Sequence, residues 1–135
     1  MKKEIAILVV DDEPMMQTLL EKILTRDGYR VLVAGDGSEA LKVMTTTDIS
    51  IVISDLQMPG MSGLDLLKAL KKDYPHVGMI IMTAYGDTHS VKDALLLGAD
   101  EYVTKPFKSF EISMVVERAY WRLLAKENRL APETD

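Results

Sequence analysis

The chain has 135 residues, the usual length of one domain, and its 47% hydrophobic and 27% charged residues are typical of a globular protein. Its formal net charge of −5 argues against direct binding of nucleic acid, and the lack of cysteine excludes disulfides, thiolate metal sites and cysteine nucleophiles. The first apolar run stops at Asp11, too early for a secretory signal or a membrane span, so we expect a cytoplasmic protein without a membrane partner.

Short apolar runs rich in Val and Ile alternate with amphipathic stretches. The predicted strands are residues 5–10, 31–34, 51–53, 79–82 and 102–103. These runs are unbroken rather than alternating, which is typical of strands buried on both faces, as in a parallel sheet covered by helices.

Helix signals fall between the strands. Pro14 suits a first helical turn and Gly28 a helix end. Side-chain N-caps are predicted at Asp36, Ser62, Asp87 and Ser109. Strand and helix therefore alternate throughout, which predicts an α/β fold of repeated βα units with right-handed crossovers.

Polar residues stand where the predicted strands end. Asp11 and Asp12 follow the first strand, Asp55 the third, Thr83 the fourth and Lys105 the fifth. In an open parallel sheet the carboxyl ends of the strands share one edge, and ligands bind there. We therefore expect three carboxylates, a hydroxyl and an ammonium group on one rim.

This set of groups suits phosphoryl transfer. The three carboxylates would repel one another, and an all-oxygen site of this kind suits Mg²⁺, which leaves room for a phosphoryl oxygen. The reaction also needs a nucleophile and a cation that balances charge on the phosphoryl oxygens. Asp55 suits the nucleophile, Lys105 the cation, and the Thr83 hydroxyl a further donor.

Each of these residues also has a purely structural interpretation. Asp11 and Asp12 could cap the next helix, and Thr83 could simply end a strand. Lys105 could be a solvated charge, although its place between an apolar strand and Pro106 argues otherwise. Their coincidence on one rim favours the chemical interpretation.

Five short segments stand at or near the predicted strand ends: residues 9–13 (VVDDE), 55–63 (DLQMPGMSG), 82–85 (MTAY), 98–102 (GADEY) and 105–107 (KPF). In this order they closely resemble the receiver domains of bacterial response regulators, and the similarity extends from residue 5 to about residue 124. The resemblance implies a flavodoxin-like, doubly wound sheet of five parallel strands in the order 2-1-3-4-5, with helices on both faces.

The resemblance also implies roles for the rim residues. Asp55 would accept a phosphoryl group from a sensor histidine kinase or a phosphotransfer protein. Asp12 and Asp55 would bind Mg²⁺ directly, whereas Asp11 would act through water and Gln57 through its backbone carbonyl. Lys105 would pair with the transferred group.

A switch pair follows from the same resemblance. On phosphorylation Thr83 would move toward the phosphoryl group and Tyr102 would rotate inward. The face made by the fourth helix, fifth strand and fifth helix would then recruit a target or output domain, or form a homodimer. Tyr102 has a simpler interpretation as a half-buried strand aromatic. The Lys105–Pro106 peptide would be cis.

Three other functions compete with this switch. A haloacid-dehalogenase-like phosphatase would carry a second Asp where this chain has Gln57; we therefore expect a receiver that catalyses only its own phosphorylation and slow autodephosphorylation. A flavin- or nucleotide-binding module would need a Gly-rich or hydroxyl-rich loop after the first strand, where residues 11–13 are acidic. A degenerate receiver would lack an acid, the acceptor or the lysine, and this chain lacks none.

The last helix has features beyond the shared domain. We predict a receiver over residues 1–125 and a helical extension or linker tail over residues 126–135. A rough heptad is interrupted at Lys126 and comprises Ile112, Val116, Ala119, Leu123 and Leu130. This helix could be a signalling linker or dimer helix, or alternatively a solvated and fraying helix end.

Overall fold

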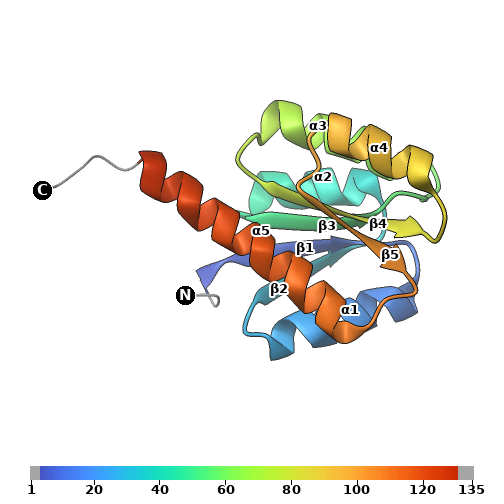
Figure 1. Ribbon diagram of the computed structural model, residues 1–135, viewed down its shortest axis with the longest axis horizontal. Helices are drawn as coiled ribbons and strands as arrows, with labels where there is room; N and C mark the ends of the chain where they lie inside the picture. The colour runs from blue at the N-terminus through green and yellow to red at the C-terminus, as the bar shows by residue number, and fades with distance from the viewer. Residues whose placement is uncertain (1–3, 131–135) are drawn as a thin grey trace, which may run out of the picture.

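The computed structural model describes residues 4–130, in which five strands alternate with five helices (Figure 1). The strands are β1 (Ala6–Val10), β2 (Arg30–Ala34), β3 (Ile51–Asp55), β4 (Gly78–Ala84) and β5 (Glu101–Lys105). The helices are α1 (Pro14–Arg26), α2 (Gly37–Thr46), α3 (Gly63–Asp73), α4 (Thr88–Leu96) and α5 (Ser109–Leu130). Within these described residues, no helix is both long enough and apolar enough to cross a membrane.

All neighbouring strands pair in parallel, in the order β2-β1-β3-β4-β5, which confirms the predicted sheet. The three central strands are buried almost throughout, as their unbroken apolar sequences predict. The edge strands β2 and β5 are partly exposed, because each has a neighbour on one side only. The sheet is therefore most deeply buried along its three central strands.

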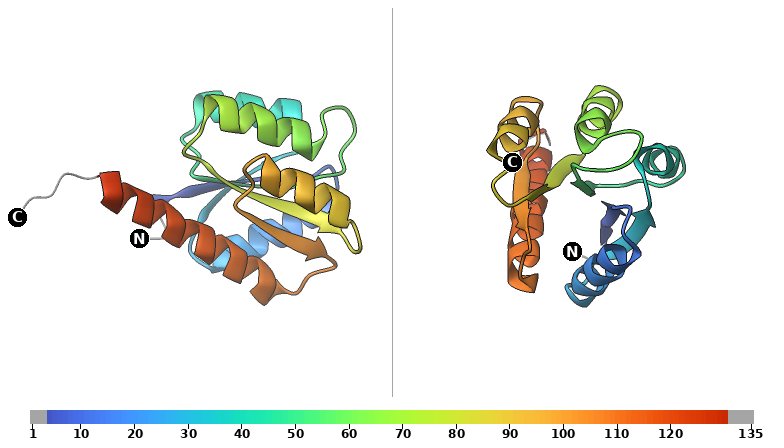
Figure 2. Two further views of the ribbon diagram at one scale, coloured as in Figure 1. Left: turned by 45° about the horizontal axis from the view of Figure 1, so that its top comes forward. Right: turned by 90° about the vertical axis from the view of Figure 1, so that its right-hand side faces the viewer.

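Helices cover both faces of the sheet, with α1 and α5 on one face and α2, α3 and α4 on the other (Figures 1 and 2). Successive strand residues point to opposite faces. Ile7 and Val9 of β1 thus pack in the cluster of α1 and α5, whereas Leu8 and Val10 pack in that of α2 and α3. The central strands are thus packed between two apolar cores, one on each face of the sheet, and this packing positions their carboxyl ends.

Three of the four predicted helix caps are confirmed. The side chains of Asp36, Ser62 and Asp87 accept hydrogen bonds of 2.8, 3.2 and 3.2 Å from backbone N–H groups three residues later. Gly28 follows the end of α1 with a φ of +98°, a left-handed conformation that glycine adopts without strain.

The fourth prediction, a cap at Ser109, is wrong. Ser109 is already helical, and Lys108 precedes the first turn of α5. The backbone N–H of Lys108 donates to Glu111 Oε1 at 2.7 Å. The Glu111 side chain thus reaches back from within the helix to the N–H of Lys108, which is the backward-pointing bond of a capping box.

The apolar stripe of α5 faces the sheet. Ile112, Val116 and Ala119 are buried in the core cluster that α5 shares with α1, and Leu123 packs against it. This part of the predicted heptad is therefore core rather than a seam between two copies. The helix continues to Leu130 and projects beyond the sheet (Figure 1). The Leu130 side chain and the predicted tail at residues 131–135 lie outside the described residues.

Candidate functional site

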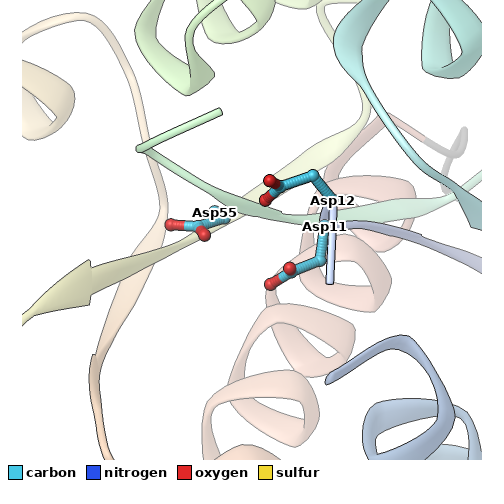
Figure 3. A group of neighbouring side chains, drawn as sticks. All are labelled: Asp11, Asp12 and Asp55. Atoms are coloured by element: carbon cyan, nitrogen blue, oxygen red, sulfur yellow. The ribbon is translucent and has the colours of Figure 1, made fainter. Parts of the chain in front are cut away.

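The predicted rim residues meet at the carboxyl edge of the sheet. Asp11 and Asp12 directly follow β1, and Asp55 is the last residue of β3. One carboxylate oxygen from each of these three acids lies within 4.8 Å of the others, and Figure 3 shows the three side chains gathered at the strand ends. Thr83 stands one residue before the end of β4, and Lys105 ends β5.

Asp11 is fully buried and is held at every polar atom. Its N–H donates to the Ala34 carbonyl at 3.1 Å, and its own carbonyl accepts from Gln17 Nε2 at 2.6 Å. Its Oδ1 accepts from the N–H of Glu13 at 2.9 Å, and its Oδ2 lies 3.1 Å from Lys105 Nζ. A buried carboxylate requires such partners, and the four bonds fix where the chain leaves β1.

Asp55 is held in a similar way but lies nearer the surface. Its residue surface is 8% exposed. Oδ1 accepts from the N–H of Gln57 at 3.1 Å, and Oδ2 accepts from Lys105 Nζ at 3.0 Å. The carboxylate is therefore oriented before any ligand arrives, while one side of it stays within reach of solvent.

The Lys105 ammonium bridges Asp11 and Asp55. Partial burial opposes its charge, but the hydrogen bonds and attraction of Asp55 and Asp11 outweigh the burial and raise the pKa of Lys105 above its ordinary value. Glu13 Oε1 also lies 3.9 Å from Nζ, although its side chain is mostly exposed. Lys105 thus remains a fixed positive charge at neutral pH.

Asp12 differs from the other two acids because it is exposed. Together the three acids offer hard, anionic oxygen ligands on one open edge, and this donor set fits a hard divalent cation. Gln57, whose backbone carbonyl is an expected metal ligand from the family resemblance, follows Asp55 by two residues and is also exposed.

The two predicted switch residues lie in opposite environments. Thr83 is 1% exposed, inside the rim, whereas Tyr102 is 45% exposed on the edge strand β5. Beyond Thr83, both Ala84 and Tyr85 are exposed. The Lys105–Pro106 peptide is cis, as the resemblance implied.

Two residues that contact the site were not indicated by the sequence pattern. Gln17 bonds to Asp11 from the first turns of α1, and its reach is recognisable only once the helix start at Pro14 is known. Gly63 packs against the Asp55 backbone, where a Cβ atom would overlap the Asp55 carbonyl oxygen. Its position inside the segment 55–63 was the only available signal.

Glu101, next to Tyr102, ties β5 to α5. It is 9% exposed, and its carboxylate accepts from Arg118 Nη2 at 2.9 Å and from Arg118 Nε at 3.2 Å, while Arg122 Nη1 lies 2.5 Å from Glu101 Oε2. Burial disfavours the charged carboxylate, but the bonds from Arg118 and Arg122 outweigh it and lower the pKa of Glu101. The ion pairs thus hold α5 beside the strand that carries Tyr102.

Replacing Glu101 with glutamine is expected to lower the free energy of unfolding by about 1–2 kcal/mol at pH 7, since both arginines lose a charged partner but are half exposed. A lowered pKa gives stability that is present above the ordinary value of 4.5 and is lost as pH falls through the folded-state value. The gap between wild type and Glu101→Gln should therefore close below pH 4.5 in urea unfolding. The exposed-residue control Glu21→Gln should show no such gap, and a constant gap down to pH 3 would contradict the assignment.

Known proteins place this arrangement in a family. The family model described as the response regulator receiver domain matches residues 7–117. The response regulator MtrA of Mycolicibacterium smegmatis is 40% identical over 125 residues, which cover 93% of this chain and 53% of that protein. Sporulation initiation phosphotransferase F of Bacillus subtilis is 35% identical over 112 residues, or 83% of this chain and 90% of that one.

A solved receiver domain protein from Clostridium thermocellum superposes with a TM-score of 0.82 at 37% identity, covering 87% of this chain and 95% of that chain. The chain spans about half the length of MtrA and 24% of the length of the transcriptional regulator NtrC of Proteus hauseri. Its matched region is thus the receiver portion of such regulators. On its family match, its fold and its acidic rim, this chain belongs to the receiver domains of two-component response regulators.

Proposed function

We propose that this chain is a phosphorylation switch in which Asp55 accepts a phosphoryl group from a sensor histidine kinase or a phosphotransfer protein. The observation that carries the proposal is the Asp55 carboxylate, oriented by Lys105 and the Gln57 N–H beside two further acids at the open edge of the sheet. Family membership supports a partner of this class.

In the proposed transfer, a carboxylate oxygen of Asp55 attacks phosphorus. The bond from phosphorus to the donor's histidine nitrogen, or to the oxygen of a small acyl phosphate, breaks as the new P–O bond forms, and the leaving group keeps the electron pair. Because protein contacts already hold Asp55, little reorganisation is needed before attack.

Mg²⁺, when bound, would neutralise charge on the phosphoryl oxygens and on the acids. Asp12 and Asp55 are the proposed direct ligands, with Asp11 acting through water and Gln57 through its backbone carbonyl. The structure supports this division, since Asp11 is buried with all its polar atoms bonded, whereas Asp12 is exposed.

Lys105 and Thr83 complete the proposed site. Lys105 Nζ, now shared by Asp11 and Asp55, would pair with a phosphoryl oxygen on Asp55. The Thr83 hydroxyl would donate to another oxygen, and the movement of Thr83 would free space into which Tyr102 turns. The α4-β5-α5 face would then recruit a target or an output domain, or form a homodimer.

The chain is proposed to catalyse only its own phosphorylation and slow autodephosphorylation, because Gln57 stands where a phosphatase would need an acid. We also propose a cytoplasmic location and a receiver body ending near residue 125. Residues 126–135 would be a helical extension or linker, and the unbroken course of α5 to Leu130 supports the helical character of its first part.

The direct test is intact mass after incubation with Mg²⁺ and a small acyl phosphate. Wild type should gain one phosphoryl group, and it should gain none when a chelator removes Mg²⁺. Asp55→Asn should gain none in either condition, because the amide is not a nucleophile. Asp48→Asn, at an exposed acid outside the rim, should behave as wild type. Uptake by Asp55→Asn would move the acceptor to another residue and overturn the proposal.

A further inference from the structure

We infer that Gln17 is a positioning residue for the acidic rim, because its side-chain amide fixes the peptide plane that joins Asp11 to Asp12. This inference rests on the proposed Mg²⁺ site. Gln17 Nε2 donates to the Asp11 carbonyl oxygen at 2.6 Å, although Asp11 lies in the loop after β1 and Gln17 lies in α1. A peptide group is planar, so holding the Asp11 carbonyl also sets the direction of the Asp12 N–H and Cα.

The Asp11 carbonyl has particular need of this donor. The paired residues of β1 end at Val10, which faces Ala34 on one side and Ser54 on the other, so Asp11 stands just past the sheet ladder. Asp11 is fully buried, and a buried carbonyl without a donor is costly. Gln17 supplies the bond that the neighbouring strands no longer provide.

Gln17 also ties the same segment to the start of α1. Its backbone N–H donates to the Glu13 carbonyl at 3.0 Å, the first bond of the helix. Glu13 is the N-cap residue but makes no side-chain cap bond, and Pro14 has no N–H to offer. One residue therefore secures residues 11–13 from both its main chain and its side chain.

Asp12 is the acid whose position depends most on the backbone of residues 11–13. Asp11 keeps three other hydrogen bonds, to Ala34, Glu13 and Lys105, so its carboxylate stays in place without Gln17. Asp12 is exposed, and its carboxylate direction depends on the backbone that carries it. Gln17 thus acts on metal binding through Asp12, without itself touching the ion.

The test is an NMR titration of the full chain with Mg²⁺ at constant ionic strength, following the amide signals of Asp12 and Gln57. Gln17→Met keeps the length of the side chain but removes the donor, and it should raise the Mg²⁺ Kd about tenfold, as loss of an outer partner of a metal ligand commonly does. The Asp12 amide of the metal-free variant should also exchange with solvent faster. Gln17→Asn, whose amide is one methylene shorter, should shift the Kd in the same direction and serves if the first variant folds poorly.

Two controls separate the possible outcomes. Thr18→Ala alters the next, exposed residue of α1, and Gly35→Ala adds a methyl group only 3.8 Å from Gln17 Nε2, an ordinary contact. Both should bind Mg²⁺ like wild type. A folded Gln17→Met with a Kd within twofold of wild type would overturn this inference alone. Wild type without any Mg²⁺-dependent shift would instead overturn the metal site on which the inference rests.

Discussion

Lys105→Met is expected to lower the rate of phosphoryl uptake by about a hundredfold or more, since a fixed positive charge facing the transferred group is lost. It should also lower the free energy of unfolding by about 2–4 kcal/mol at pH 7 without Mg²⁺. The reason is the bridge that Lys105 Nζ makes to Asp11 and Asp55 at 3.1 and 3.0 Å. This loss of stability is somewhat less than the cost of breaking a fully buried ion pair, because Lys105 is only partly buried. Intact mass over time gives the rate, and urea unfolding gives the stability.

Two dependences distinguish this effect from a general loss of packing. Mg²⁺ should restore part of the stability of Lys105→Met, because another cation then balances the acids. The raised pKa of Lys105 gives stability that is present below its ordinary value of 10.5 and is lost as pH rises through the higher folded-state value. The gap to wild type should therefore hold up to pH 10.5 and close above it. Lys68→Met, at an exposed lysine of α3, should change neither quantity, and an equal effect there would refute the bridge as the cause.

Gly63→Ala is expected to lower the free energy of unfolding by about 3 kcal/mol or more, at the upper end for overpacked sites. The added Cβ would overlap the Asp55 carbonyl oxygen and would lie 2.6 Å from Leu56 Cα. Both neighbours are backbone atoms, so no side chain can turn aside to make room. The strand end that carries Asp55 must shift, and phosphoryl uptake should fall in the fraction that still folds.

Gly60 provides the matched comparison for Gly63. It lies three residues earlier, in the loop between β3 and α3, with a φ of +76°, and a Cβ there would meet nothing within 4 Å. Gly60→Ala should therefore cost only the local strain of a left-handed residue, about 1–2 kcal/mol. Thermal unfolding of both variants, with uptake measured at 10 °C below each midpoint, gives the comparison. Equal losses would show that crowding against Asp55 is unimportant.

The rim could be predicted from the sequence because its composition depends only on which residues stand at the strand ends. Asp11, Asp55, Thr83 and Lys105 each close an apolar run, and parallel strands bring their carboxyl ends to one edge whatever the details of packing. The strand order followed from the resemblance to a family, since apolar runs alone do not say which strands are neighbours.

Contacts between distant elements could not be predicted in this way. The bond from Gln17 to Asp11 depends on the exact start of α1, and the ion pair between Glu101 and Arg118 depends on how α5 crosses β5. The predicted cap at Ser109 failed because α5 begins one residue earlier than expected, so that Ser109 is already helical and Glu111 bonds back to the N–H of Lys108. Capping signals fix a helix start only to within a residue or so.

The heptad in the last helix illustrates a different limit. Over three turns, a stripe that packs on a sheet and a stripe that packs on a second helix differ little, because the periods 3.6 and 3.5 have barely diverged. Ile112, Val116 and Ala119 fit both, and only the fold shows that they are buried by their own chain. The opposite side of α5 is where Met114 and Trp121 are exposed.

The unbroken course of α5 has a mechanical consequence. With 22 residues, the helix is about 33 Å long, and its first half is clamped to the sheet while its end projects past it (Figure 1). It is therefore a lever whose short arm lies beside β5. A tilt of about 10° about the middle of the helix would carry the far end, about 16 Å away, through about 3 Å. A small change in the direction of the packed half of α5 would therefore become a larger displacement at the far end of the helix.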